Sequence, residues 1–421
     1  MANTHSTLKE LLTNIASAIK AKNNSTAPIV ADDFPSEIEK MISRFDYISQ
    51  RVTSIPDYAF YNTTELLNAN LCGVTDIGTA AFKNCSNLKT VILYDTTVSV
   101  GEDTFKGCDN AVIYCEAPSK PDTWNENWNP DNCTVMWGHK AIETWDISAT
   151  EEDNVTAKLY NDIHHEGMYQ LVISGSGAMF NYYTHDRPPW YAYRDEITSV
   201  AINYSVTSIC SDAFFGCTSL TSITIPDSVT YIGKNTFYSC SRLTSITIPD
   251  SVRYIYIYTF YNCRSLTSVT ISDSVTSISG SAFRGCTNLT SITIPDSVTS
   301  IGESAFAYCT SLTSVTISDS VTSISGSAFR GCTNLTSITI PDSVTSIGDH
   351  VFRDCLSLTS ITIWDSVAYI GADAFYSCRS LTSIIYKGTM EQWNNIEFDI
   401  HWNLDTGNYT IHCTDGDIPK S

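Results

Sequence analysis

A repeat of 23 residues is the feature that most constrains how this chain can fold. Between Ile197 and Ser380 one unit recurs eight times, and the copy that begins at Leu289 reads LTSITIPDSVTSIGESAFAYCTS. The units begin at Ile197, Leu220, Leu243, Leu266, Leu289, Leu312, Leu335 and Leu358. A fixed period of this length is typical of a solenoid, in which each unit is one coil stacked on its neighbours.

The pattern inside one unit predicts the path of one coil. Apolar residues recur at positions 1, 4, 6, 10, 13, 17, 18 and 21 of the unit. Positions 1, 4 and 6 give the leucine-rich spacing L-x-x-I-x-I, and their alternation with Ser and Thr predicts a strand. The Pro-Asp-Ser or Ser-Asp-Ser that follows predicts a turn. Val-Thr-Ser-Ile then predicts a second short strand, and Ala-Phe-x-x-Cys predicts a helical or 3₁₀ turn. We therefore expect parallel β-sheets along the stack.

Two residue types occupy fixed columns, Phe at position 18 and Cys at position 21 of every unit. We expect each Phe ring to stack on the next inside the coils. Because each coil contributes one Cys and the chain has no C-x-x-C pair, the pattern disfavours zinc sites and disulfides. The thiols are predicted to be free and buried, and to pack as small hydrophobic groups.

Charge and composition limit the classes of partner and the cellular locations to be expected for this chain. The net charge of −21 and the pI near 4.6 disfavour nucleic acid and anionic membranes as partners. The start, MANTHSTLKELL, lacks a basic stretch followed by an apolar run, so we expect synthesis in the cytoplasm without a signal peptide. Unpaired cysteines fit folding in a reducing compartment. No window approaches ~18 apolar residues, which predicts no membrane insertion.

Changes in the pattern along the chain predict five segments. Residues 1–43 contain two short amphipathic helices and form either an attachment segment or a cap on the solenoid. Residues 44–138 are a first, degenerate repeat block, and 197–386 are the main solenoid. Residues 139–196 form a small β cap or linker, which seals the main solenoid or fuses the two blocks into one body. Residues 387–421 form a C-terminal cap, in which Asp415–Ser421 are expected to be loose.

A group of tyrosines is the candidate ligand-binding site. The unit that begins at Leu243 differs most from the others, and it shares aromatic positions with the unit before it. Exposed tyrosines offer rigid area with a polar tip, which suits sugars and protein hot spots. The alternative is drift at exposed positions, favoured by the exact recurrence of Leu266–Gly302 at Leu312–Gly348. The predicted site comprises Tyr231, Tyr238, Tyr254, Tyr256, Tyr258 and Tyr261.

Three other patterns have weaker functional interpretations. The Asp column at position 8 predicts carboxylates that accept backbone N–H bonds, with weak Ca²⁺ binding along the ridge as the alternative. Ser and Thr at positions 2, 3 and 5 predict a solvated β-face, with binding of ice or a repetitive glycan as the alternatives. His164, His165 and His185 are interpreted as surface residues. We find no catalytic motif and predict no enzyme, no cofactor and no metal. The Asp column comprises Asp227, Asp250, Asp273, Asp296, Asp319, Asp342 and Asp365.

The unit L-T-S-I-T-I-P-D-S-V-T-S-I-G-x-x-A-F-x-x-C resembles the BspA-like (treponemal-type) leucine-rich repeat over residues 44–135 and 197–386. Segments 145–193 and 386–416 resemble the caps that accompany this family. Residues 15–22 together with 31–38 resemble a short N-terminal module of phage and prophage structural proteins from Firmicutes. The first resemblance implies adhesion or recognition rather than catalysis.

Together these resemblances imply a binding protein of the virion. The expected partner is a host-surface protein or glycan, and residues 1–43 are expected to attach the chain to a virion or form a homo-oligomer. The expected location is the virion surface, or the outside of the cell after lysis. The alternative is a bacterial surface adhesin or an interaction scaffold without a virion role. The missing signal peptide and wall anchor disfavour ordinary secretion.

Overall fold

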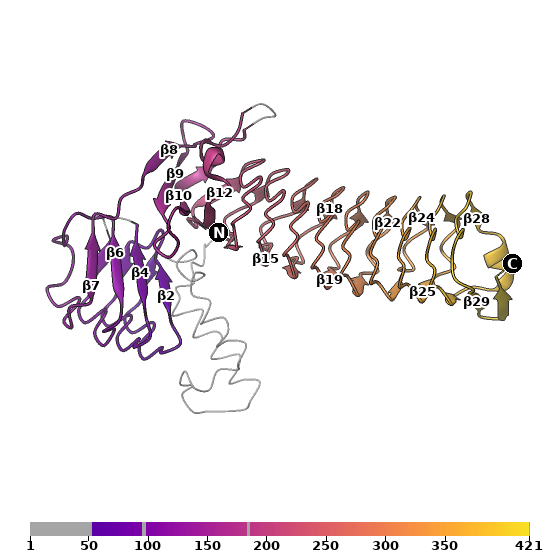
Figure 1. Cartoon of the computed structure of the whole chain (residues 1–421), viewed down its shortest axis with the longest axis horizontal. Helices are drawn as coiled ribbons and strands as arrows, with labels where there is room; N and C mark the ends of the chain where they lie inside the picture. Colours follow the sequence, from indigo (N-terminus) through magenta and orange to yellow (C-terminus); the bar gives the residue numbers. More distant parts are fainter. Residues whose placement is uncertain (1–52, 95–97, 183–185, 421) are drawn as a thin grey trace, which may run out of the picture. The chain divides into compact units, whose positions relative to one another are not determined.

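The computed structural model describes residues 53–94, 98–182 and 186–420. They form two compact units. The first unit contains the described residues up to Glu143 together with Ala201–Tyr204, and the second contains Thr144–Val200 and the described residues from Ser205 onward. Within each unit, successive coils pair their strands in parallel, which confirms the predicted repeat solenoid (Figure 1). The helices and the virion module predicted within residues 1–43 lie outside the described residues.

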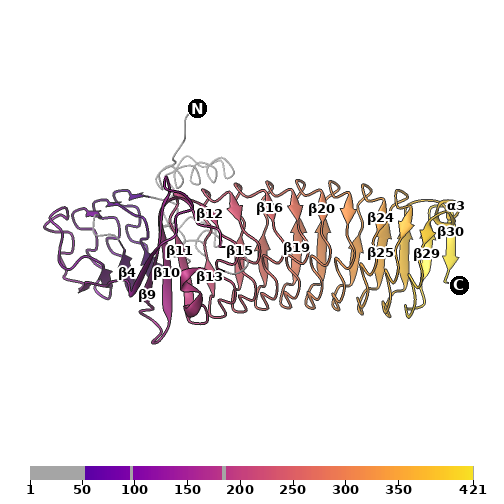
Figure 2. The ribbon, with the colours of Figure 1, turned by 90° about the horizontal axis from the view of Figure 1, so that it is seen from above.

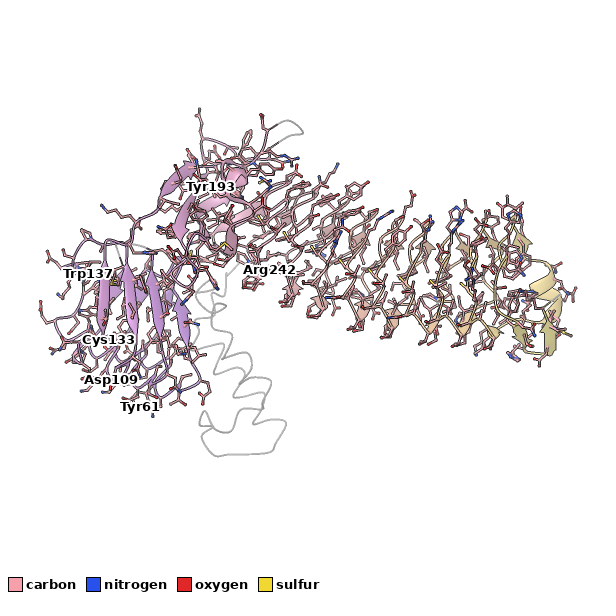
Figure 3. The ribbon with its side chains drawn as sticks, viewed as in Figure 1. Tyr61, Asp109, Cys133, Trp137, Tyr193 and Arg242 are labelled. Carbon is pink, nitrogen blue, oxygen red and sulfur yellow. The ribbon has the colours of Figure 1, made fainter. Side chains whose placement is uncertain are left out.

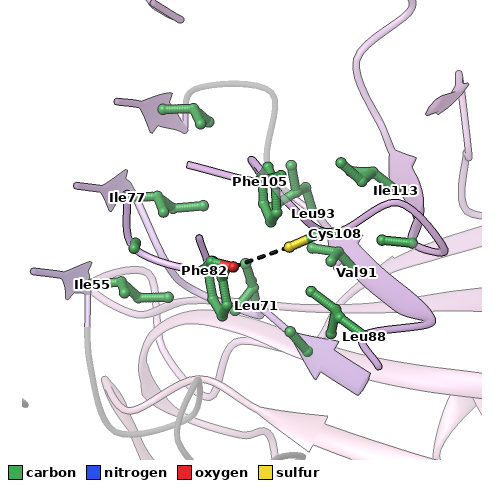
Figure 4. Packing of buried hydrophobic residues seen from close by; sticks show 14 of the residues in the cluster. Ile55, Leu71, Ile77, Phe82, Leu88, Val91, Leu93, Phe105, Cys108 and Ile113 are labelled. Carbon is green, nitrogen blue, oxygen red and sulfur yellow. Dashed lines mark hydrogen bonds between the residues drawn. The ribbon is translucent and has the colours of Figure 1, made fainter. Parts of the chain in front are cut away.

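The first unit contains two parallel sheets around an apolar core. Coils repeat every 22 or 23 residues, so Ile55 pairs with Ile77 and Val91 pairs with Ile113. The core includes Phe82 and Phe105, drawn in Figure 4. One sheet consists of β1 (Ser54–Ile55), β3 (Asp76–Ile77) and β5 (Ser99–Val100). The other consists of β2 (Asn68–Asn70), β4 (Thr90–Leu93), β6 (Val112–Cys115) and β7 (Thr134–Trp137), and Figure 3 labels Cys133 and Trp137 in this last coil.

Three strands and a 3₁₀ helix cover the start of the second unit. They are β8 (Glu143–Asp146), β9 (Asn154–Asn161), β10 (Tyr169–Ala178) and η3 (Pro189–Tyr193). β10 pairs antiparallel with β9 and also joins β11 (Ile197–Ile202) and β12 (Val206–Ile209) of the first coil. On η3 the buried Trp190 donates its indole N–H to the Ala213 carbonyl oxygen at 2.7 Å. A non-repetitive cap therefore covers the edge of the first coil.

The following coils of the second unit form two sheets that differ in continuity. The back sheet, made of strands at coil positions 12 and 13, runs unbroken from β16 to β28, and in Figure 2 β16, β20 and β24 follow one another along it. Its strands are β16 (Tyr254–Ile255), β18 (Ser277–Ile278), β20 (Ser300–Ile301), β22 (Ser323–Ile324), β24 (Ser346–Ile347), β26 (Tyr369–Ile370) and β28 (Glu397–Phe398). β14 (Tyr231–Ile232) occupies the same positions one coil earlier and pairs with β12.

The front sheet, made of strands at positions 3 to 6, is interrupted. Its strands pair as β15-β17, as β19-β21, and then as an unbroken run from β23 to β30. They are β15 (Ser245–Thr247), β17 (Ser268–Thr270), β19 (Ser291–Ile294), β21 (Ser314–Ile317), β23 (Ser337–Thr339), β25 (Ser360–Ile363), β27 (Ser383–Tyr386), β29 (Thr410–Cys413) and β30 (Gly416–Pro419). β13 (Ser222–Ile223) pairs with β11 instead.

The predicted Phe column is confirmed. From Phe214 to Phe375 successive ring centroids lie 5.1–5.9 Å apart, and every ring is fully buried. At its C-terminal end, Trp402 meets Phe375 edge-on at 81°. The shorter column of the first unit also ends on an edge-on indole, with Trp128 against Phe105 at 88°. An indole turned across the stack thus terminates each column.

The cysteines are free and buried as predicted, but they also act as hydrogen-bond donors. The Cys240 thiol donates to the Phe214 carbonyl oxygen of the preceding coil at 3.1 Å, and the same link recurs in each later coil as far as Cys378. Figure 4 shows the equivalent bond from Cys108 to Phe82. Burial raises the pKa of the Cys309 thiol to about 12, so the donating proton is retained at neutral pH.

We expect one fast-reacting thiol in the native protein. Fourteen of the fifteen cysteines are buried and only Cys413 is partly exposed, so a thiol reagent at neutral pH should label Cys413 alone. Unfolding in guanidinium should then release the other fourteen. Counting labelled thiols by mass spectrometry checks this, with Cys413→Ser as the control that removes the fast phase. Several fast thiols in the native state would contradict it.

The predicted helical or 3₁₀ turn is a run of tight turns. Backbone bonds from residue i to i−3 close it, such as the bond from Tyr261 N–H to the Tyr258 carbonyl oxygen at 3.2 Å. Positions 16 and 20 have positive φ in all eight coils, and a left-handed residue ends any right-handed helix. Position 16 is Asp212, Asn235, Tyr258, Ser281, Ser304, Ser327, His350 and Asp373. Position 20 is Gly216, Ser239, Asn262, Gly285, Tyr308, Gly331, Asp354 and Ser377.

The C-terminal end of the second unit is closed by a short helix and a hairpin. Helix α3 (Met390–Asn394) begins with a capping box formed by Thr389 and Gln392. The expectation that Asp415–Ser421 are loose is wrong for β30, which pairs antiparallel with β29. Parallel strands leave an unpaired edge at the end of a stack, and the hairpin covers that edge.

Candidate functional site

The structure separates the six predicted tyrosines into two groups. The first, which we call the corner cluster, comprises Tyr231 on β14 with Tyr254 and Tyr256 on and just after β16. The Tyr256 ring centroid lies 5.3 Å from that of Tyr231 and 6.0 Å from that of Tyr254. Tyr254 is 50% exposed, so its ring is open to a ligand.

The second group is built around a ring ladder formed by Phe215, Tyr238 and Tyr261 at position 19. Their centroids lie 4.6 and 4.7 Å apart with nearly parallel planes. The Arg187 guanidinium lies 4.6 Å from the Phe215 centroid, and Tyr258 meets Tyr261 edge-on at 5.6 Å. Because the ladder rings lie face to face, Tyr238 presents mainly its edge and hydroxyl. Sequence reasoning missed Phe215 and Arg187, although Phe215 shares position 19 with both tyrosines.

Tyr258 places a bulky side chain at a position that has positive φ in every coil. Its φ is 59°, in a left-handed region that is costly for bulky residues, and its side chain is 37% exposed. The first unit contains the same arrangement, which sequence reasoning also missed: Tyr58 has φ 58° and meets Tyr61 edge-on at 5.9 Å. Both occur in the motif Y-x-F-Y-N, a shared signal that was available in the sequence. Figure 3 labels Tyr61, which is 42% exposed.

The hydroxyls of Tyr238 and Tyr256 remain protonated at neutral pH. Burial, followed by the neighbouring Tyr231 and Tyr254, raises the pKa of Tyr256 above its ordinary value. Burial and then Tyr261 raise the pKa of Tyr238 in the same way. Each hydroxyl can therefore donate a hydrogen bond as well as accept one. Such a surface can contact a neutral ligand through apolar edges and hydroxyls.

The Asp column is exposed, and its turns are held by other groups. In the second coil the Val229 N–H donates to the Pro226 carbonyl oxygen at 3.0 Å, and Ser228 Oγ donates to the Val206 carbonyl oxygen at 2.7 Å. Asp250 instead accepts from Ser272 Oγ at 2.6 Å. Across the described ranges no group of three His, Cys, Asp or Glu residues is placed to hold a metal ion.

Threonine hydroxyls on the front face are engaged with the backbone. At position 2, Thr267 Oγ1 donates to the Thr244 carbonyl oxygen at 3.0 Å, and Thr359 makes the same bond to Thr336. These bonds join adjacent coils next to the paired strands β15-β17 and β23-β25, which gives a structural reason for threonine at this position.

The histidines of the cap have an acidic neighbour that sequence reasoning missed. The buried Asp162 carboxylate lies 3.0 Å from His165 Nδ1 and accepts the Thr198 hydroxyl at 2.6 Å. It also accepts the His164 backbone N–H at 2.8 Å, so it orders this loop. His185 lies outside the described residues.

The repeat pattern is shared with a known protein family. A family model described as "BspA type Leucine rich repeat region (6 copies)" matches residues 41–127, 190–313 and 299–415. The chain belongs to this family. The matched ranges include the Phe and Cys columns of both units, so the BspA-type repeat accounts for most of the described fold. In the part of the chain that the structure describes, no helix is both long and apolar enough to cross a membrane.

Several solved structures are similar to this BspA-type chain. A leucine-rich cell surface protein of Faecalibacterium prausnitzii is 27% identical, with a TM-score of 0.36, and the match covers 82% of this chain and 86% of that one. A leucine-rich repeat protein of Bacteroides ovatus is 23% identical (TM-score 0.34, covering 86% and 87%). The leucine-rich repeat protein of T. pallidum is 22% identical (TM-score 0.31, covering 53% and 87%). No curated protein matches this chain.

Proposed function

We propose that this BspA-type protein is a non-enzymatic recognition protein that binds a protein or glycan on the surface of a host cell. The observation that carries the proposal is the presentation of Tyr254 on β16 and Tyr258 on the turn that follows it, both exposed. Aromatic side chains contribute a large share of binding energy at interfaces because they are rigid and amphipathic. The predicted site thus becomes a surface centred on these two residues.

The backbone strain at Tyr258 supports this proposal. Residues in sparsely populated conformations cost about 1–3 kcal/mol and cluster at binding sites. Four of the other coils place Asp, Asn or His at position 16, and three place Ser. A bulky tyrosine at this position in both units, each time paired with a tyrosine three residues later, is consistent with selection for binding over stability.

The double substitution Tyr254→Ala with Tyr256→Ala is expected to weaken binding to host cells by at least tenfold. Central aromatic residues of an interface cost about 2 kcal/mol or more when truncated, which corresponds to roughly 30-fold in affinity. Flow cytometry of labelled protein on host cells, or surface plasmon resonance on purified surface glycans and proteins, measures the change. The melting temperature should stay close to that of the wild type, because Tyr254 is exposed and Tyr256 is half-buried.

A matched control removes the same side chain elsewhere on the same sheet. Tyr369 shares position 12 with Tyr254 five coils later, and its hydroxyl donates to Asp399 at 2.9 Å. Tyr369→Ala should leave cell binding unchanged. Tyr258→Asn relieves the backbone strain, so it should keep or raise stability while lowering binding. Undiminished binding by the Tyr254 and Tyr256 variant would remove the tyrosine surface from consideration.

Attachment to a virion through residues 1–43 is the second part of the proposal, and it places the protein on the virion surface or outside the cell after lysis. The supporting observation is the resemblance of that segment to phage structural proteins. Deleting residues 1–43 should abolish recovery of the chain with purified particles but leave cell binding intact. Recovery of the full chain on the bacterial surface, and never with particles, would favour the adhesin alternative. Loss of cooperative melting on deletion would instead identify a cap.

A further inference from the structure

Beyond the gap between β13 and β15, the front sheet is interrupted at two further places, which have nearly identical sequences. β17 pairs with β15 but not with β19, and β21 pairs with β19 but not with β23. We call the gap between β17 and β19 the first slit and the gap between β21 and β23 the second slit. The back sheet stays paired across both. Adjacent coils therefore remain joined at the back and are open at the front.

Backbone groups at the two slits lack their usual partners. On the closed side of each coil pair, the Thr267 N–H donates to the Thr244 carbonyl oxygen and the Thr313 N–H to the Thr290 carbonyl oxygen, both at 2.9 Å. Within the described residues, Thr290 and Thr336 make no equivalent bond across the slits. Donors and acceptors that elsewhere join coils are thus available to a ligand.

One wall of each slit is more open than the other. At position 4, Val269 and Val315 on the first wall are only half-buried, whereas Ile292 and Ile338 on the opposite wall are at most 4% exposed. At position 6, Ile317 is likewise half-buried. A strip of apolar surface therefore lies uncovered at each slit.

A cavity of about 470 Å³ lies over the first slit and extends across β19 to Thr316 and Ser318 of the next coil. Its floor includes Val269, its rim carries the hydroxyls of Thr270 and Thr293, and the carboxylates of Asp273 and Asp296 lie at one end. Its volume falls in the range of small-ligand sites, about 300–1,000 Å³. No Lys or Arg lines it, so the cavity presents negative charge without any compensating cation.

This chemistry fits a neutral sugar ring. The apolar C–H face of a pyranose can rest on the valine, while its hydroxyls bond to the free backbone groups, the threonine hydroxyls and the carboxylates. Two carboxylates without a cation repel sulfated, phosphorylated or sialylated ligands. An extended peptide strand does not fit, because Cα atoms of β17 and β19 come within 8 Å, whereas strands flanking an inserted strand would lie ~9.6 Å apart.

We infer that the two slits are paired subsites for a linear neutral oligosaccharide. Leu266–Gly302 recurs without change at Leu312–Gly348, so the second slit repeats the walls of the first two coils later, at a distance of ~10 Å. One oligosaccharide can therefore bind both slits at once, and its overall affinity is then higher than its affinity for either slit alone. The site lies on the front sheet, apart from the tyrosine surface on the back sheet and turns, and stands independently of it.

Blocking each slit with a bulky residue tests the inference. The probes are neutral gluco-, manno- and galacto-hexasaccharides on an array, followed by calorimetry with the best binder, and chondroitin sulfate is the anionic comparison. Thr293 and Thr339 are exposed and occupy equivalent places at the two slits. We expect Thr293→Trp or Thr339→Trp alone to lower affinity at least tenfold because bivalent contact is lost, and the double variant to abolish binding.

Controls make each outcome decisive. Thr362→Trp, at the same position of β25, which is paired on both sides, should leave affinity unchanged, and so should Tyr369→Ala on the back sheet. Asp273→Asn with Asp296→Asn, which adds no bulk, should weaken the neutral hexasaccharide. Melting curves confirm that each variant is folded. Failure of every neutral hexasaccharide to bind, equal binding of chondroitin sulfate, or full affinity in the double Trp variant would overturn the inference.

Discussion

Phe306→Ala is expected to lower the free energy of unfolding of the second unit by about 3–5 kcal/mol. Phe306 is fully buried between Phe283 and Phe329, with ring centroids 5.3 and 5.6 Å away. The coils on either side are joined by strand pairs and thiol bonds, so they cannot move together to fill the space that alanine leaves. Urea unfolding followed by circular dichroism measures the change.

A graded substitution separates the cavity from a general loss of aromaticity. Phe306→Leu keeps most of the buried volume, so it should cost clearly less than alanine. The same alanine change in Tyr376, which is half-buried at position 19 of another coil, should cost less still. If Phe306→Ala and Phe306→Leu had equal effects, packing along the column would not be the source of the stability.

Alkaline pH is expected to destabilise the second unit more than any single substitution. Burial raises the pKa of its nine buried thiols above the ordinary 9.0, for example to about 12 for Cys210 and Cys378. A group with a raised folded-state pKa contributes stability that is complete below the unfolded pKa and is lost as pH rises toward the folded value. At about pH 10 each thiol would forfeit about 1 kcal/mol, so nine would forfeit on the order of 10 kcal/mol. Typical domains have only about 5–15 kcal/mol, and unfolding near this pH is expected.

Both thiols and tyrosines can lose protons at alkaline pH, and a cysteine variant distinguishes their contributions to the number of protons released on unfolding. In Cys286→Ala, the slope of the unfolding free energy against pH should become shallower by the contribution of one thiol proton. The same variant should lose about 1 kcal/mol at neutral pH, because the Phe260 carbonyl oxygen loses its thiol donor at 3.2 Å. An unchanged slope in Cys286→Ala would show that the thiols do not govern the alkaline transition.

The burial and stacking of the Phe and Cys columns could be predicted because they follow from the 23-residue period alone. Phe283 and Cys286 recur at one spacing, and any stacked coil places such residues over one another. The thiol bond was not predictable, because its acceptor is a backbone carbonyl whose direction depends on the left-handed residues at positions 16 and 20. Sequence reasoning predicted a helical or 3₁₀ turn there, since only the backbone reveals those conformations.

The candidate site could be predicted in composition but not in geometry. Shared positions placed Tyr231 with Tyr254 and Tyr238 with Tyr261, and the second pair does stack. The position numbers could not show that Tyr256 would pack against Tyr231 across the coil boundary. The slits were equally hidden, because the same sequence LTSITI pairs on one side only in β19 and on both sides in β25.

Identical joints between coils make the length of this stack adjustable. On the back sheet Ser277 pairs with Ser300 and Ile301 with Ile324 in the same register, and boundaries that lie 46 residues apart have the same sequence. Removing residues 289–334 would join two surfaces that already match, and inserting 46 residues would do the same. A gene of this kind can therefore lengthen or shorten its product by recombination in a single step, changing reach without any new interface having to evolve.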